Sequence, residues 1–219
     1  MRDLELRGMV SAHCTLILAL LSATFVTPLI LEDFHLIGTH LVWLCVCSAS
    51  VTAVSVILCL ALGTSSVSSK KNFSQKVTKV FRSCVLFSVS CLVFHGIIVL
   101  YGAPLLESLW ETFLFAVLLS TFTTLRCLCL LGPSLHAWIR VFSKNGAMSI
   151  WDTSLQITTA CSIFGAWLGA IPIPLDWDRP WQVWPVSCTL GATFGFAVGL
   201  IGAPLWIHWH KKQLTYKSR

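Results

Sequence analysis

Six long apolar runs alternate with short polar segments along the 219-residue chain, and each run is close to 20 residues long. A helix needs about 20 apolar residues to cross the hydrocarbon core of a bilayer. The pattern therefore predicts an all-α, polytopic membrane protein with six transmembrane helices in one membrane domain over residues 1–219. The predicted spans lie at about residues 10–31, 41–62, 83–101, 110–131, 153–170 and 186–209.

A shorter amphipathic segment lies between the fourth and fifth spans, at about residues 134–144. On a helix, its apolar side chains share one face and its cations the opposite face, which is typical of a helix lying in the membrane interface. The apolar set is Leu135, Trp138, Ile139 and Phe142, and the polar set is His136, Arg140 and Lys144. The alternative is a plain loop continuous with the next span.

Composition and charge support the membrane interpretation and exclude two other classes. Hydrophobic residues make up 56% of the chain and charged residues 11%, whereas soluble domains carry about 25% charged residues. Fourteen of the fifteen Lys and Arg residues fall on one side of the six predicted spans, and only Arg179 falls on the other. The positive-inside rule then predicts that both termini are cytosolic. The net charge of +6 is thus a topology signal, and no nucleic-acid partner is expected.

Two further sequence features have simple interpretations. The ten cysteines lie within or at the ends of apolar runs and without a C-x-x-C pair, so we interpret them as small hydrophobic residues. The sequon at Asn72 falls in a loop predicted to be cytosolic, and we expect it to stay unglycosylated.

The stretch at residues 171–185 differs from every other connection. It holds four of the eight prolines and three of the ten tryptophans. Proline removes backbone donors and prevents a regular helix, and tryptophan prefers the membrane–water boundary. We predict a rigid lumenal Trp/Pro hairpin that acts as a contact surface.

Glycines recur every four residues in the last two spans: Gly165 and Gly169, then Gly191, Gly195 and Gly199. Small residues at this spacing let helix backbones approach closely in lipid. The spacing leaves open whether the glycines face another span of the same chain or another protein.

Few other side chains suggest chemistry. Arg126 lies inside an apolar run about five residues from its cytosolic end, and we predict that it snorkels toward the interface. His95 is interpreted as a structural group within the bundle. Glu107 and Glu111 share the lumenal surface with Asp176 and Asp178, but no metal-binding or nucleophile motif appears among them. We therefore expect no cofactor and no catalytic activity in this chain.

The sequence resembles the phosphatidylinositol-glycan biosynthesis class F family over essentially its whole length. The resemblance rests on the hairpin string, Gly165-Ala-Trp through Trp184-Pro185, and on five further stretches. These are Ser149-Ile-Trp through Leu155-Gln-Ile-Thr-Thr, Tyr101-Gly-Ala-Pro-Leu, Glu111-Thr-Phe-Leu-Phe-Ala, Cys127-Leu-Cys-Leu-Leu-Gly-Pro and the ending from Pro204-Leu-Trp. The chain departs from the family pattern at Arg126, where proline is usual.

The resemblance implies a multi-pass protein of the endoplasmic reticulum membrane that functions in GPI-anchor biosynthesis. It implies an accessory subunit that binds and stabilises large ethanolamine phosphate transferase catalytic subunits of the PIG-O and PIG-G type. These catalytic partners would supply the divalent metal and add phosphoethanolamine to mannoses of the GPI precursor.

One alternative is a subunit that binds or presents a lipid, either phosphatidylethanolamine or the GPI precursor, within the same complex. A membrane-embedded transferase in its own right is a further alternative. The candidate partner or lipid contacts are Asp176, Trp177, Asp178, Arg179, Trp181, Trp184, Gly165, Gly169, Gly191, Gly195, Gly199, Glu107, Glu111 and His95.

Overall fold

The computed structural model describes residues 2–30, 39–61, 73–104, 107–144, 146–175, 177 and 179–210, and this part is all-α, without a strand. The long helices are α1 (Arg2–Ile30), α2 (His40–Ala61), α3 (Phe73–Leu100), α4 (Leu109–Ser120), α7 (Ile150–Ala170) and α8 (Val186–Trp209). The short elements are the π-helix η1 (Thr121–Leu125), α5 (Arg126–Leu131), α6 (Leu135–Phe142) and the 3₁₀ helix η2 (Pro180–Gln182).

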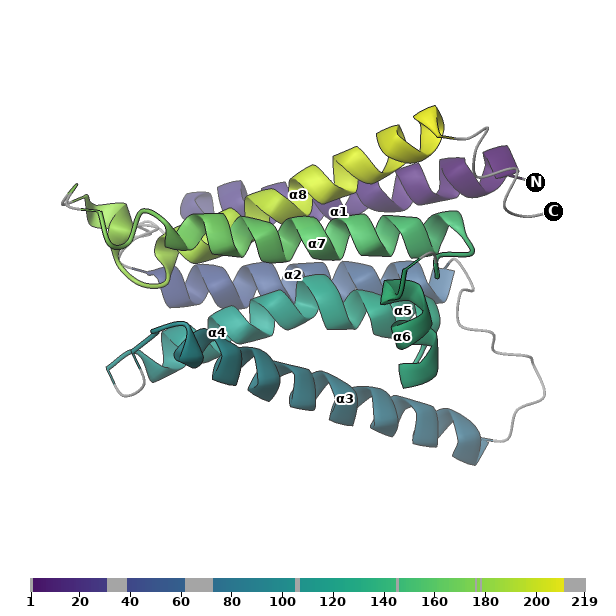
Figure 1. Cartoon of the computed structure of the whole chain (residues 1–219), viewed down its shortest axis with the longest axis horizontal. Helices are drawn as coiled ribbons and strands as arrows, with labels where there is room; N and C mark the ends of the chain where they lie inside the picture. Colours follow the sequence, from purple (N-terminus) through teal and green to yellow (C-terminus); the bar gives the residue numbers. More distant parts are fainter. Residues whose placement is uncertain are drawn as a thin grey trace.

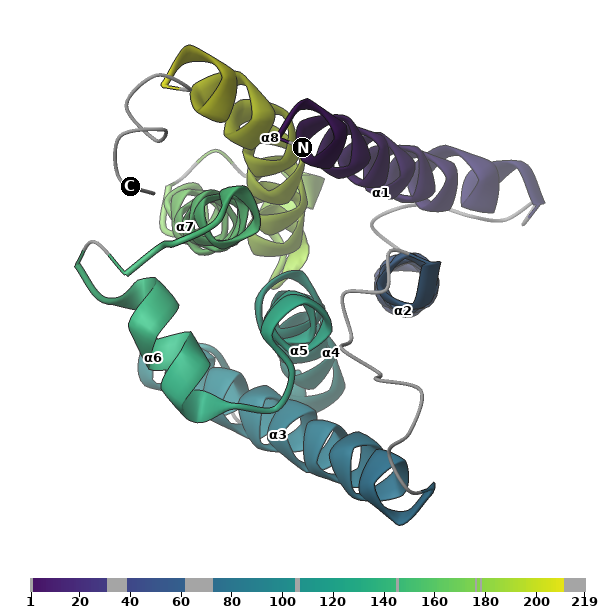
Figure 2. The same ribbon diagram turned by 90° about the vertical axis from the view of Figure 1, so that its right-hand side faces the viewer.

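The long helices run side by side as one bundle (Figure 1). The start of α1 and the end of α8 lie at the same end of the bundle, which we call the α6 end because α6 also lies there. The connection between α7 and α8 lies at the opposite end. Seen along α7 and α2, helix α6 runs across the bundle rather than along it (Figure 2). The two ends therefore differ in architecture, with a crosswise helix at one and the Trp/Pro hairpin at the other.

Five helical segments in the described part are long and apolar enough to cross a membrane. They are Leu4–Phe25, His40–Ala61, Ser74–Leu100, Leu109–Leu131 and Val186–Trp209. The predicted fifth span is present as the 21-residue α7, but it does not meet the same criterion. Its Ser, Thr and Gln side chains lower its hydropathy, and most of them are buried against neighbouring helices. The polytopic class is confirmed, and the sixth span remains a prediction.

Helices α1 and α3 begin eight and ten residues earlier than the apolar pattern predicts. Helix α1 starts at Arg2 rather than near residue 10, because the first turns find a packing partner: Met9 is fully buried against Ile150 and Ile207. Helix α3 starts at Phe73 rather than residue 83 and includes Lys76 and Arg82 as exposed residues. Helix boundaries follow backbone hydrogen bonding, which continues beyond the apolar part of each span.

The amphipathic segment at 134–144 forms α6, so the loop alternative is wrong. Of the predicted apolar face only Trp138 packs inward: it lies in one cluster with the buried Val141 and donates from Nε1 to the Gly132 carbonyl at 2.9 Å. Ile139 is 70% exposed. On the opposite face, Arg140 is only partly exposed and pairs with Asp152 at 3.6 Å. These contacts fix α6 to the neighbouring helices.

Helix α7 begins where its sequence provides a cap. The Ser149 hydroxyl accepts a hydrogen bond from the Asp152 backbone N–H at 3.0 Å, and the Asp152 carboxylate accepts one from the Met148 N–H at 3.0 Å. Both bonds satisfy backbone donors that a helix start would otherwise leave free. The cap therefore starts the helix at Ile150, three residues before the predicted start of the span.

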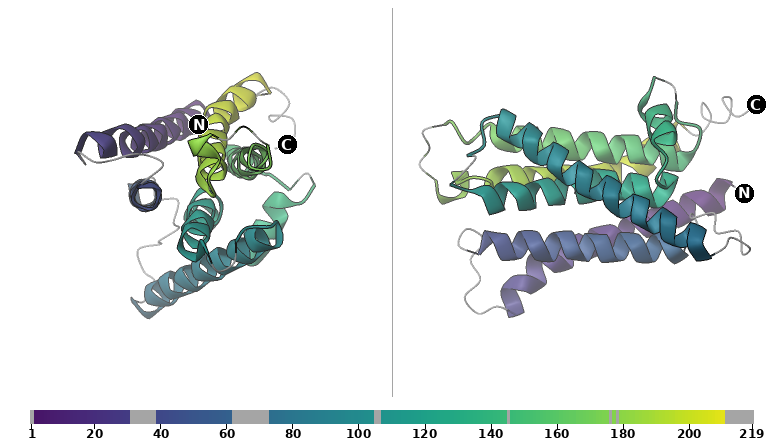
Figure 3. Two further views of the ribbon diagram at one scale, coloured as in Figure 1. Left: turned by 90° about the vertical axis from the view of Figure 1, so that its left-hand side faces the viewer. Right: turned by 90° about the horizontal axis from the view of Figure 1, so that it is seen from below.

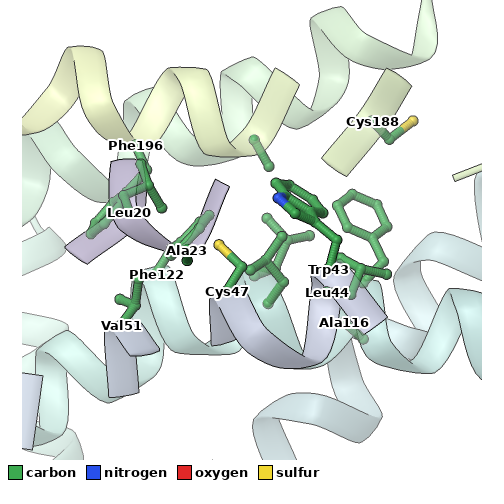
Figure 4. Close-up of a cluster of buried hydrophobic side chains, with 14 of the residues drawn as sticks. Leu20, Ala23, Trp43, Leu44, Cys47, Val51, Ala116, Phe122, Cys188 and Phe196 are labelled. Atoms are coloured by element: carbon green, nitrogen blue, oxygen red, sulfur yellow. The ribbon is translucent and has the colours of Figure 1, made fainter. Parts of the chain in front are cut away.

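The core of the bundle lies between α1, α2, α4 and α8 (Figure 4). Trp43 and Leu44 of α2 are fully buried in it. Phe122 of η1 stacks on Phe196 of α8, with ring centroids 4.3 Å apart and planes 4° from parallel. Helix α3 contributes little: it crosses the bundle obliquely at its edge (Figure 3), and only Cys91 and Ile98 of its described side chains are buried. Ser90 anchors it by hydrogen bonds to Ser120 and Thr124.

Candidate functional site: the Trp/Pro hairpin and the helix pair beneath it

The hairpin is held by a series of tight turns and by one side chain, Gln182. Backbone bonds from Ile173, Leu175 and Trp177 continue the chain in turns beyond α7. The Gln182 amide donates to the carbonyls of Pro172 and Leu175, each at 2.7 Å, and its oxygen accepts from the Arg179 N–H at 2.7 Å. Gln182 thus ties the two arms of the hairpin together.

The three hairpin tryptophans divide into two roles. Trp177 is 55% exposed and Trp181 37% exposed, and their rings meet edge to face with centroids 6.0 Å apart. Trp184 instead faces the bundle: its Nε1–H donates to the Thr112 hydroxyl of α4 at 2.9 Å, and its ring packs edge-on against Phe115. Trp184 therefore anchors the hairpin, whereas Trp177 and Trp181 form an exposed aromatic pair.

The charged hairpin residues are only partly described. Arg179 is exposed and caps η2 through its backbone. Asp176 and Asp178 lie outside the described residues. The exposed part of the hairpin that the structure describes is thus aromatic and apolar, with Arg179 at its edge.

All five predicted glycines lie between α7 and α8, the most extensive helix pair in the bundle. A Cβ added at Gly165 would overlap the carbonyl of Gly191, and one added at Gly195 would overlap that of Cys161. Gly169 meets the backbone of Ser187 and Cys188 in the same way, and Gly199 that of Thr158. The two backbones are thus in direct contact over several turns. Of the two alternatives left open by the spacing, the structure favours packing within the chain.

The remaining candidates on the hairpin side of the bundle do not converge on one another. Glu107 is exposed and Glu111 is partly exposed in the first turn of α4. His95 lies edge-on to Phe113 with centroids 6.0 Å apart, and its Nδ1 has no hydrogen-bond partner in the described part. No group of three or more His, Cys, Asp or Glu side chains within the described ranges could hold a metal ion.

The prediction that Arg126 snorkels to the interface is wrong. Arg126 is only 5% exposed and lies inside the bundle, where its guanidinium is 3.4 Å from His13 Nε2 and 6.0 Å from the Phe196 ring centroid. The side chain turns inward because α1 and α8 supply these two groups. The position of the residue along its own span does not reveal them.

A family model and three relatives that match this chain all belong to GPI biosynthesis. Residues 13–204 match the GPI biosynthesis protein family Pig-F. A human protein and a mouse protein, each described as "GPI ethanolamine phosphate transferase, stabilizing subunit", are 56% and 54% identical over 218 residues, and these alignments cover 100% of this chain and of each relative. A "Glycosylphosphatidylinositol anchor biosynthesis protein 11" of Yarrowia lipolytica is 36% identical over 54% of this chain and 50% of its own length. No solved structure matches the chain.

Proposed function

Because the chain belongs to the GPI biosynthesis protein family Pig-F, we propose that it is the stabilizing, non-catalytic subunit of a GPI ethanolamine phosphate transferase. The observation that carries this proposal is the 56% identity, over the full length of both chains, with the human protein of that description. The absence of a nucleophile or metal-binding motif in the sequence agrees with an accessory role. Its partner is a transferase subunit that performs the chemistry.

The finer details of this proposal rest on the family resemblance. The partners are large catalytic subunits of the PIG-O and PIG-G type, which carry the divalent metal and transfer phosphoethanolamine to mannoses of the GPI precursor. The complex works in the endoplasmic reticulum membrane.

The partner contact is the exposed aromatic pair of the hairpin, Trp177 and Trp181, with Arg179 at its edge. Hot spots of protein interfaces are enriched in Trp and Arg. The Gln182 bonds and the prolines preorganise the loop, which lowers the entropy lost on binding. The glycines of α7 and α8 act indirectly, since their close contact holds the base of the hairpin.

Six spans with both termini in the cytosol form the membrane topology of the proposal. Helix α7 has 21 residues and a length of about 31 Å, which matches the roughly 30 Å hydrocarbon core. It pairs with α8 along its length (Figure 1), and most of its polar side chains are hydrogen-bonded within the chain, as in Ser162 to the Thr158 carbonyl at 2.7 Å. A helix whose polar groups are mostly satisfied in this way is compatible with lipid despite its lower hydropathy.

The function is tested by purifying the tagged full-length chain in mild detergent and identifying what binds it. We expect a large transferase subunit to co-purify, and we expect ethanolamine phosphate transfer to depend on that subunit. The chain expressed and purified alone should show no transfer. Transfer by the isolated chain, or purification without any transferase, would contradict the proposal.

The topology is tested with epitope tags at the N-terminus, at the C-terminus and after Leu175 in the hairpin. When only the plasma membrane of expressing cells is permeabilised, both terminal tags should bind antibody and the hairpin tag should not. All three tags should bind after complete permeabilisation. A five-span protein would instead place the two terminal tags on opposite sides of the membrane.

A further inference from the structure

A small cavity lies at the α6 end of the bundle, lined by α1, α2, α5 and α7. Its volume is about 30 Å³, and it is partly open to the outside. Ser55 of α2, Arg126 of α5 and Trp151 of α7 are among the residues that line it. A cavity of this size holds more than one water molecule, so it has room for the oxygens of a small polar group.

The cation beside this cavity lacks a counter-charge. Arg126 is 95% buried, and no carboxylate of the described residues lies within ion-pair distance of it. The His13 Nδ1–H donates to the Leu200 carbonyl at 2.8 Å, so Nε2 is the acceptor for the Ser154 hydroxyl at 3.0 Å and for the guanidinium. His13 is therefore neutral and leaves the charge of Arg126 uncompensated. A buried charge in this state is strongly destabilising.

Two hydrogen-bond donors at the cavity also lack partners. Nε of Arg126 and Oγ of Ser55 are both buried, and neither has a hydrogen-bond partner within the described ranges. They come from different helices and line the same cavity. Buried polar groups are rarely left unsatisfied in native structures. A group that offers several acceptor oxygens and a negative charge would satisfy both donors and neutralise the guanidinium.

The cavity lies near the α6 end of the bundle, where Arg126 and Ser55 line it five and six residues before the ends of α5 and α2. Its lining includes Cys59, two residues before the end of α2, and Leu130, one residue before the end of α5. Trp151 is the second residue of α7. All three helix ends lie at the α6 end of the bundle, where the crosswise α6 also lies (Figure 2). Because Trp is enriched at the membrane–water boundary, Trp151 indicates that this side of the cavity lies close to the lipid headgroups.

We infer that the cavity beside Arg126 binds the phosphate of a membrane phospholipid. Water could satisfy the two donors but would leave the charge of Arg126 uncompensated, whereas a phosphodiester supplies a charge-assisted hydrogen bond to the guanidinium. The site lies at the end of the bundle opposite the hairpin, so it is independent of the proposed partner contact. The bound lipid would join α1, α2, α5 and α7 as a structural ligand.

The inference is tested by thermal unfolding of the delipidated full-length chain in detergent, with four additives in separate titrations. Phosphatidylethanolamine and phosphatidylglycerol should each raise the Tm by about 5 °C or more at saturation. Diacylglycerol with the same acyl chains, which lacks the phosphate, should have little effect. An equal shift from inorganic phosphate alone would identify a free anion and overturn the lipid assignment. No phosphate dependence with any additive would overturn the site itself.

Three variants locate the effect. Arg126→Met should raise the phospholipid concentration at half-maximal Tm shift by at least tenfold. Ser55→Ala keeps the charge of Arg126 and removes one neutral donor, so it should raise that concentration by about threefold to tenfold. If Arg126→Met does not fold, Ser55→Ala alone tests the site. Lys144→Gln removes an exposed cation at the same end and should leave the titration unchanged. Equal titrations for the wild type and Ser55→Ala, together with a change in Lys144→Gln, would indicate nonspecific attraction and contradict the site.

Discussion

Replacing Gly195 by alanine is expected to destabilise the folded chain strongly, although the substitution adds a single methyl group. The new Cβ would overlap the carbonyl oxygen of Cys161 and lie 3.1 Å from Gly165 Cα. Both neighbours are backbone atoms, so no side-chain rotation relieves the overlap. Helices α7 and α8 would have to separate along the most extensive helix contact of the bundle. We expect a loss of about 3 kcal/mol, at the upper end of measured overpacking effects.

The measurement is the Tm of the purified chain in detergent, which should fall by roughly 6 to 12 °C for a protein of this size. Gly202→Ala is the matched control: it makes the same change in the same helix, but nothing lies within 4 Å of its added Cβ. Because alanine has the higher helix propensity, Gly202→Ala should be neutral or slightly stabilising. Similar Tm values for the two variants would show that α7 and α8 do not pack through Gly195.

This helix pair illustrates what the sequence predicts and what it leaves open. The four-residue spacing of Gly191, Gly195 and Gly199 is enough by itself to predict a close helix contact. The spacing does not reveal the partner, because small residues facing a second protein would recur at the same interval. The opposing glycines and Cys161 in α7 answer that question only when the two helices are placed together.

Arg126 shows a different limit. Its distance from the span end predicts snorkelling, and that prediction is wrong because the choice between interface and interior depends on what the other helices present. His13 is 113 residues away and Phe196 is 70 residues away in sequence. The π-helix just before Arg126, at Thr121–Leu125, has no distinctive sequence signal either. The inward position of Arg126 is therefore tertiary in origin.

The sequence predicts the location of the hairpin, but it does not predict which side chains hold the hairpin together. Its proline and tryptophan content indicates its position and stiffness, but neither residue type points to Gln182, which joins its two arms. A sequence signal for Gln182 does exist. Proline at the first position of a helix and glutamine at the third are typical of a helix start, and Pro180 and Gln182 occupy these positions after Arg179. The separate role of Trp184 has no such signal, since it depends on Thr112 and Phe115 of α4.

Simultaneous replacement of Trp177 and Trp181 by alanine should release the transferase subunit while the chain itself stays folded. Both rings are exposed and meet each other edge to face in the hairpin, outside the core of the bundle, so their loss should leave the bundle intact. Interface tryptophans at hot spots contribute about 2 kcal/mol or more, and the loss of both as one unit should weaken binding by at least about thirtyfold. The measurement is the yield of transferase subunit that co-purifies with the tagged chain at equal expression.

Two matched variants separate partner contact from stability. Trp167→Ala removes a tryptophan of α7 that is 54% exposed outside the hairpin, and it should retain the partner at full yield. Trp184→Phe removes the hydrogen bond to Thr112 and should lower the stability of the chain by about 1 kcal/mol, because its role is to hold the hairpin on α4. If the Trp177/Trp181 variant keeps the transferase at wild-type yield, the exposed aromatic pair is not the contact. If Trp167→Ala loses the transferase instead, the partner binds the outer face of α7, and the hairpin only caps the helix pair that carries the interface.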